Sequence, residues 1–149
     1  MHDAKVESEI TIGTSPQRVW NFLTDPNKIP LAMPSLIGNY NVPELPLKVG
    51  SKFNYKYQMF GIILEGEVTV DTFNEPSIYE FSTSGDVQSN WTYTLDGTEN
   101  STKLRLSATY VTPESVTAKL KSKIIAKMNQ KESELYLENL KTVLEMQSE

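Results

Sequence analysis

Aromatic residues with polar tips recur at alternating positions in the middle of the chain. Tyr55 and Tyr57, then Trp91 and Tyr93, and later Tyr110 each fall on the same side as large apolar residues of alternating segments. Alternate side chains of a β-strand point to one face, so these residues are expected to face the interior. Several hydroxyl and indole N–H groups that converge on an apolar wall are typical of a ligand cavity. Taken singly, each is read more simply as a core residue whose polar tip reaches the backbone or the solvent.

Residues suited to acid–base, nucleophilic or metal chemistry are scarce. The chain has no cysteine and one histidine, His2, which argues against a thiolate or histidine metal site and against a Ser-His-Asp triad. Glu65, Glu67 and Arg105 fall on the outward side of their segments, and unperturbed tyrosine titrates near pH ~10. We therefore assign no catalytic residue, no metal and no cofactor. Glu80 would change this assignment if its strand turned the carboxylate inward.

The bulk composition is that of an ordinary globular domain. A chain of 149 residues with 38% hydrophobic and 22% charged residues is long enough for one domain with a real core. The net charge of −5 argues against a nucleic-acid-binding protein. No apolar run approaches the roughly 18 residues of a membrane span, and no secretion signal is visible, so we expect a cytoplasmic protein without stable membrane insertion. The sequence leaves the oligomeric state unknown.

Seven segments have the pattern of β-strands, and two short helices follow the first of them. Helix signals are the cap-and-proline pairs Ser15-Pro16 and Asp25-Pro26, which together predict a V-shaped elbow. Short turns join the later strands and predict antiparallel pairing. The inward face of the segment 77–84 stays open, because both of its faces carry an apolar residue. The predicted strands are 5–12, 39–42, 52–59, 63–71, 77–84, 90–96 and 101–111.

The last third of the chain, 112–147, predicts a long helix, since it has no proline or glycine after Pro113. Seven strands at roughly 4.8 Å spacing are far wider than one helix, so the sheet must curl around it and leave space that is hard to fill. The apolar stripe shifts across the polar run Asn129–Ser133, which predicts a bend or a change of packing partner there. In this interpretation the half before the bend closes one region of the cavity.

Residues 9–34 resemble the opening pattern of a known superfamily. The matching positions are Ser15-Pro16, Val19-Trp20, Leu23, Asp25-Pro26 and Met33-Pro34, and Lys48-Val49-Gly50 resembles the glycine turn before the third strand. The order of elements and these motifs are similar to those of the START/Bet v 1-like (SRPBCC) superfamily, which includes polyketide cyclase/dehydrase-like proteins. Asn139-Leu140-Lys141 resembles the end of the last helix in relatives of an accessory protein of carbon monoxide dehydrogenase, which belong to the same superfamily.

The resemblance implies an α+β helix-grip fold in a single domain, 1–149. A seven-stranded curved antiparallel sheet would surround the C-terminal helix, with a hydrophobic cavity between them. Together with the inward strand positions, this predicts the cavity lining. The predicted lining residues are Phe22, Met33, Phe53, Tyr55, Tyr57, Met59, Leu64, Val68, Phe81, Trp91, Tyr93, Leu106, Ala108, Tyr110, Leu120, Ile124 and Met128.

Three hypotheses for the function follow. The first is a carrier or sensor of a small apolar ligand such as a lipid, an isoprenoid or an aromatic or polyketide-like compound. The second is a polyketide aromatase/cyclase or dehydratase, which would need a general acid or base inside the cavity. The third is an adaptor that docks on a membrane or a protein through Lys119, Lys123 and Lys127, which repeat at helical spacing with Lys121 and Lys131 nearby. A solvated helix face explains the same lysines without a partner.

Overall fold

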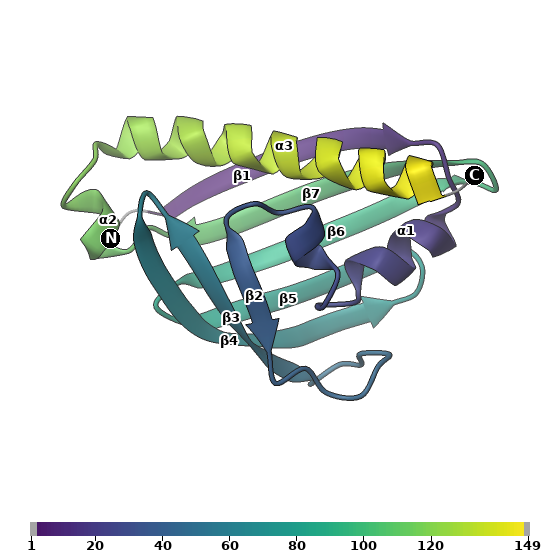
Figure 1. Cartoon of the computed structure of the whole chain (residues 1–149), viewed down its shortest axis with the longest axis horizontal. Coiled ribbons are helices and arrows are strands. Elements are labelled where there is room, and N and C mark those ends of the chain that lie inside the picture. The colour runs from purple at the N-terminus through teal and green to yellow at the C-terminus, as the bar shows by residue number, and fades with distance from the viewer. Residues whose placement is uncertain (1–2, 148–149) are drawn as a thin grey trace.

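The computed structural model describes residues 3–147 and shows a seven-stranded antiparallel sheet that curls around one long helix (Figure 1). This arrangement confirms the predicted helix-grip fold; His2 lies outside the described residues. The strand order is β1-β7-β6-β5-β4-β3-β2. The elements are β1 (Asp3–Ile12), α1 (Pro16–Leu23), the 3-10 turn η1 (Ile29–Leu31), β2 (Leu36–Tyr40), β3 (Lys52–Met59), β4 (Ile62–Asn74), β5 (Ile78–Gly85), β6 (Gln88–Thr98), β7 (Ser101–Val111), α2 (Glu114–Thr117) and α3 (Ser122–Gln147).

The elbow between β1 and β2 forms from local capping signals. The Ser15 side chain accepts a hydrogen bond from the Arg18 backbone N–H, and Pro16 occupies the first turn of α1. Pro30 lies within the second segment, which is limited to the single 3-10 turn η1. Asn139 of α3 donates a hydrogen bond of 3.0 Å to the backbone carbonyl of Ala32. The elbow is therefore tied directly to the long helix.

The curl of the sheet brings β3, β4 and β5 close together at one glycine. Gly66 pairs with Tyr55 on β3 and with Gly85 on β5. A Cβ at position 66 would lie 1.9 Å from the backbone oxygen of Ser84 and 2.6 Å from the Tyr55 hydroxyl. The missing side chain therefore lets the Tyr55 ring cross β4 and reach β5.

The predicted single helix from residue 112 is wrong, because the chain is interrupted between α2 and α3. Residues 118–121 are not helical, and α3 then runs without a break through Asn129–Ser133, where the sequence had predicted a bend or a change of packing partner. Val116 and Ile125 are both buried in one cluster with Met59 and Leu64. In a continuous helix, nine residues at about 100° each would place Val116 and Ile125 on opposite faces. The interruption lets both residues face the sheet.

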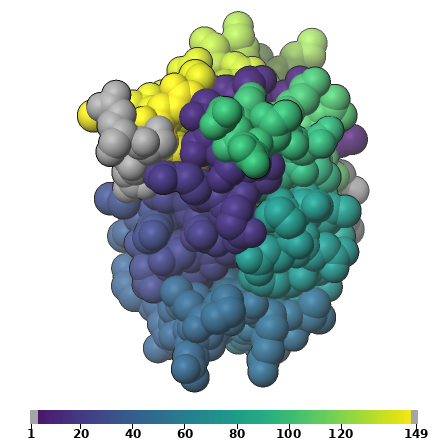
Figure 2. Space-filling view, turned by 90° about the vertical axis from the view of Figure 1, so that its right-hand side faces the viewer, coloured from purple at the N-terminus to yellow at the C-terminus, as the bar shows by residue number. Residues whose placement is uncertain are grey.

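Two clusters of buried side chains hold the helix on the sheet. The larger one joins α1, the sheet and the C-terminal half of α3 around Trp20, Leu104 and Leu140. The smaller one contains Met59, Leu64, Val116 and Ile125. Figure 2 shows the end of the molecule where α1 (purple) lies against the turn between β6 and β7 (green) and against the C-terminal part of α3 (yellow). Among the described helices, none is long and apolar enough to cross a membrane.

Candidate functional site

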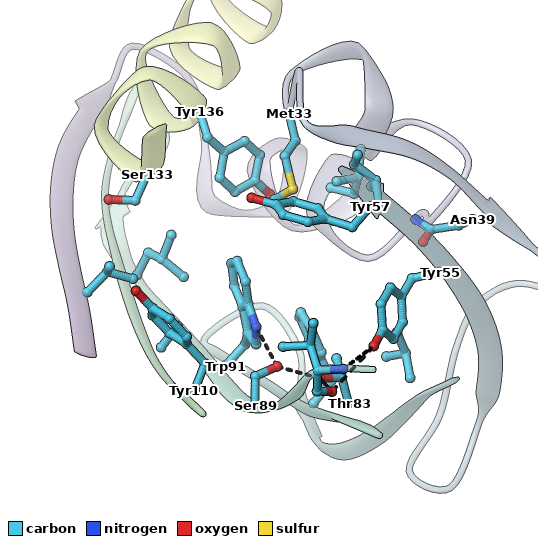
Figure 3. Close-up of a pocket in the computed structure, with 18 of the residues that line it drawn as sticks. Met33, Asn39, Tyr55, Tyr57, Thr83, Ser89, Trp91, Tyr110, Ser133 and Tyr136 are labelled. Atoms are coloured by element: carbon cyan, nitrogen blue, oxygen red, sulfur yellow. Dashed lines mark hydrogen bonds between the residues drawn. The ribbon is translucent and has the colours of Figure 1, made fainter. Parts of the chain in front are cut away.

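A cavity of about 160 Å³ lies between the concave face of the sheet and α3 (Figure 3). Tyr57 and Val87 line it and pack against both hydrophobic clusters, so the cavity lies where the two clusters meet. For scale, an apolar cavity of about 150 Å³ can hold a benzene molecule. Of the residues predicted to line a cavity, the structure brings together Met33, Phe53, Tyr55, Tyr57, Met59, Val68, Phe81, Trp91, Tyr93, Leu106, Ala108 and Tyr110.

The structure places the other five predicted residues outside the cavity wall. Phe22 is buried in the larger cluster, Leu64 is buried in the smaller one, and Leu120 packs against the smaller one. Ile124 and Met128 are 45% and 47% exposed. The correction for these two residues has a simple cause: α3 begins afresh at Ser122, so its inward face starts at Ile125 and not at Ile124.

The open question about the segment 77–84 is resolved by its neighbours. Tyr79, Phe81 and Thr83 line the cavity. Glu80 lies on the other face, where its carboxylate accepts hydrogen bonds from Thr72 and Thr92, each 2.8 Å long. Glu80 is therefore not an acid of the cavity.

A stacked aromatic wall forms one side of the cavity. Tyr79 and Tyr93 stack with ring centroids 5.9 Å apart, and Phe81 and Trp91 stack at 5.6 Å. The Tyr93 hydroxyl also shares a buried hydrogen bond of 2.8 Å with Tyr136 of α3. Because these rings hold one another in place, the wall is preformed.

Polar groups at the floor of the cavity are satisfied by one another (Figure 3). The indole N–H of Trp91 donates to Ser89 Oγ at 3.0 Å, and Thr83 donates to the backbone oxygen of Val87 at 2.8 Å. Since the Thr83 hydrogen is used in this way, the hydrogen bond between Ser89 and Thr83 has Ser89 as donor. The Tyr55 hydroxyl donates to the Ser84 carbonyl at 2.9 Å and accepts from the Val87 N–H at 3.1 Å. These contacts orient the wall and leave little capacity for a ligand.

Four residues from β3, β7 and α3 form a second polar group, here called the polar cluster: Tyr57, Tyr110, Asn129 and Glu132. The Tyr57 hydroxyl donates to Glu132 Oε1 at 3.2 Å, and the Asn129 amide donates to the Tyr110 hydroxyl. Burial raises the pKa of the Glu132 carboxyl, and the hydrogen bond from Tyr57 partly opposes this rise. Burial and the nearby Glu132 charge raise the pKa of Tyr57 above its ordinary value.

Sequence reasoning missed Asn129, Glu132 and Ser133, although the signal was present. Their polar run was interpreted as a bend, yet it faces the cavity and β1. Glu132 and Asn129 lie on the helix face between Ile125 and Tyr136, because these spacings return to nearly the same angle at about 100° per residue. Other lining residues outside the prediction are Val6, Leu23, Pro26, Ile29, Leu36, Asn39, Tyr79, Thr83, Val87, Ser89 and Tyr136.

The arrangement suits apolar binding better than metal chemistry. Within residues 3–147, no group of three or more His, Cys, Asp or Glu side chains is placed to hold a metal ion. The one carboxylate that lines the cavity, Glu132, takes part in none of the ion pairs found in this part of the chain.

Residues 3–145 match the profile of a family described as polyketide cyclase / dehydrase and lipid transport. The chain belongs to this family. Membership confirms the resemblance to the START/Bet v 1-like superfamily that the elbow motifs indicated. The fold and the family together fit a ligand-binding domain of the START and polyketide cyclase type.

Several solved structures are similar in fold to the chain over nearly its whole length. TTHA0849 from Thermus thermophilus is 18% identical, with a TM-score of 0.81 over 97% of this chain and 99% of that one. A START superfamily protein from Mycobacterium smegmatis is 13% identical, with a TM-score of 0.78 over 95% and 97% of the two chains. The ZhuI aromatase/cyclase from a Streptomyces species is 16% identical, with a TM-score of 0.76 over 99% and 97%. No curated protein sequence matches the chain. At these identities the likeness shows the fold alone.

Proposed function

We propose that this member of the polyketide cyclase/dehydrase and lipid transport family binds a small apolar ligand in the cavity and acts as its carrier or sensor. The observation that carries the proposal is a cavity of about 160 Å³ that is bounded by the preformed aromatic wall and by a small polar cluster. Apolar walls with a few polar groups that fix orientation are the usual build of small-molecule sites.

The volume limits the ligand. A space of about 160 Å³ accommodates one ring with a short substituent, by comparison with an apolar cavity of about 150 Å³ that holds benzene. A long lipid or a polycyclic compound is larger than this space. A monocyclic apolar compound therefore fits the cavity best.

The test is to extract purified protein with organic solvent and to identify any bound compound by mass spectrometry. The variant Ala108→Phe should lose that compound, because Ala108 is 2% exposed and lines the cavity. Thr109→Phe adds a ring to the exposed face of the same strand and should keep it. Extracts without any bound compound, together with no binding of monocyclic probes, would contradict the proposal.

One specific observation favours the aromatase/cyclase or dehydratase hypothesis. The sequence had suggested no acid or base in the cavity, but Glu132 lines it beside the Tyr57 hydroxyl. Burial raises the pKa of the Glu132 carboxyl, and a carboxyl beside a hydroxyl inside a cavity is the kind of group that proton transfer needs. If the protein converts the compound that it carries, Glu132→Gln should abolish conversion even at a compound concentration that saturates the variant. If the variant still converts the compound, Glu132 is not the acid or base of the reaction.

The docking hypothesis rests on the exposed side of the α2–α3 region. Lys119, Lys123 and Lys127 are exposed, and Ile124 and Met128 are exposed beside them. No acidic residue occurs between Ser115 and Lys131. A surface that combines lysines with exposed apolar side chains is complementary to anionic lipid headgroups and the acyl region beneath them.

A further inference from the structure

The two polar groups of the cavity differ in what they leave for a ligand. At the floor, the hydroxyls of Tyr55, Thr83 and Ser89 donate and accept within the protein. In the polar cluster on the α3 side, the hydrogen bonds between the four residues use only part of their hydrogen-bonding capacity. We therefore expect a polar group of the ligand to form its hydrogen bonds at the polar cluster.

Glu132 has unused acceptor capacity. An ionised carboxylate has two oxygens with about four lone-pair sites, and within residues 3–147 Glu132 accepts only the hydrogen bond from Tyr57, through Oε1. Its second oxygen is open to a hydrogen-bond donor on a ligand. No ion pair in the described chain neutralises its charge.

Tyr110 supplies the complementary group. Its hydroxyl oxygen accepts a hydrogen bond from Asn129, and the hydroxyl hydrogen has no acceptor within the described residues. A phenol in this state can donate to a ligand oxygen. Figure 3 shows the Tyr57 and Tyr110 hydroxyls directed toward α3 from the two sides of the cavity.

From this pairing we propose that the cavity selects a small apolar compound with one uncharged hydroxyl, such as an alkylated phenol or an alicyclic alcohol, and rejects the matching carboxylate. The proposal rests on the proposed function, since it requires that the cavity binds an apolar ligand. The ligand hydroxyl donates to Glu132 and accepts from Tyr110, and its apolar body lies against the aromatic wall.

Charge and hydrogen bonding explain the selection. A carboxylate ligand brings a second negative charge next to the half-buried Glu132, and like charges at close range repel. A protonated amine satisfies the charge of Glu132 but offers no acceptor to the Tyr110 hydrogen. A hydroxyl satisfies both residues at once. An unsubstituted hydrocarbon satisfies neither and gains only from the apolar wall.

The experiment compares four probes of one shape by calorimetric titration at pH ~8, where unperturbed phenol is neutral and carboxylate is ionised. The probes are propylbenzene, 4-propylphenol, 4-propylbenzoate and 4-propylbenzylamine. We expect 4-propylphenol to bind about tenfold more tightly than propylbenzene, because it makes a hydrogen bond to a charged group. The benzoate should bind more weakly than propylbenzene.

Three variants assign the effect to the two residues. Glu132→Gln should weaken the phenol about tenfold and strengthen the benzoate by a similar factor. Tyr110→Phe should weaken the phenol severalfold and leave propylbenzene unchanged. Glu138→Gln changes an exposed carboxylate of the same helix and should leave all four affinities unchanged. Circular dichroism of each variant checks that the fold is retained.

The outcomes separate the two proposals. If propylbenzene and 4-propylphenol bind equally, or if the benzoate or the amine binds most tightly, the selection for a hydroxyl is wrong and the apolar cavity function stands. If none of the four probes binds, the apolar cavity function fails, and the selection for a hydroxyl fails with it.

Discussion

The hydroxyl of Tyr57 on β3 donates a hydrogen bond to Oε1 of Glu132 on α3 across 3.2 Å. This contact joins β3 of the curled sheet to the helix, and both residues line the cavity. Among the described residues, Glu132 is the one carboxylate in the cavity wall; burial raises its pKa, and this hydrogen bond opposes the rise in part.

Replacement of Tyr57 by Phe should remove this contact and keep the ring. We expect the free energy of unfolding to fall by about 1 kcal/mol, the usual net worth of such a hydrogen bond. The pKa of Glu132 should rise further, because the contact that lowers it is gone. Urea denaturation and NMR titration of the glutamate carboxyls measure the two effects. Tyr40→Phe, at a largely exposed tyrosine, is the control, and an unchanged Glu132 pKa in Tyr57→Phe would contradict the expectation.

The stability of the protein should respond to pH through Glu132. Its pKa is higher in the folded state than the ordinary value, so the folded protein holds this proton more tightly than the unfolded chain. Stability is therefore lost as the pH rises from the ordinary glutamate pKa through the raised folded pKa.

Glu132→Gln carries no such proton, and its unfolding free energy relative to the native protein should increase between pH ~4 and pH ~7. Glu9 and Glu145 have lowered pKa values, because hydrogen bonds with Lys103 and Lys141, respectively, favour their ionised forms. Their opposite effects are present in both proteins and cancel in the difference. Denaturation curves over this pH range measure the difference in unfolding free energy between the variant and the native protein. If this difference becomes smaller as the pH rises, the predicted direction is wrong.

The buried pair Tyr93 and Tyr136 should behave as a coupled unit. Both residues are almost fully buried and share a hydrogen bond of 2.8 Å. Either single change to Phe leaves one buried hydroxyl without its partner and should cost about 1–3 kcal/mol. The double variant should cost less than the sum of the two single changes. A double-mutant cycle by chemical denaturation measures this coupling, and strict additivity would contradict it.

Gly66 should not tolerate a side chain. In Gly66→Ala, the new Cβ would meet the Ser84 backbone oxygen at 1.9 Å, and it would press on the Tyr55 hydroxyl. We expect a loss of about 3 kcal/mol or more in unfolding free energy, since backbone on β5 must shift. Gly13→Ala is the matched control, because its Cβ would meet only the side chain of Glu145, at 3.3 Å. If the two variants are equally stable, the backbone of β5 can shift at little cost in free energy, and the prediction is wrong.

If the lysines near the start of α3 dock on a membrane, Lys123→Gln together with Lys127→Gln should weaken binding to vesicles that contain phosphatidylserine. A loss of about tenfold or more is expected, since each lysine near an anionic surface contributes about 1 kcal/mol. Lys28→Gln together with Lys48→Gln changes two exposed lysines elsewhere and should have little effect. Co-sedimentation with vesicles measures the binding of both double variants. If the two bind equally, Lys123 and Lys127 belong to a solvated helix face and do not dock on the membrane.

Much of the fold followed from local patterns. Alternation placed Phe53, Tyr55 and Tyr57 on the inward face of one strand, and the cavity wall contains all three. Helix α1 begins at Pro16, directly after its N-cap residue Ser15, as predicted. These signals are readable because strand period, helix caps and proline geometry depend on neighbours along the chain.

The tertiary structure decided what depends on distant partners. Phe81 faces the cavity because its strand pairs it with Val70 and Trp91, and its own segment gave no preference. Neither the interruption at 118–121 nor the inward face of α3 could be read from the helix sequence, since Val116 and Ile125 are placed by a cluster that includes Met59 and Leu64. Glu132 lies in the cavity wall, and its hydrogen-bond partner there, Tyr57, is 75 positions away in the sequence. Sequence by itself thus determined the sheet, the elbow and the apolar wall, whereas only the packing of α3 on the sheet decided which polar groups face the ligand space.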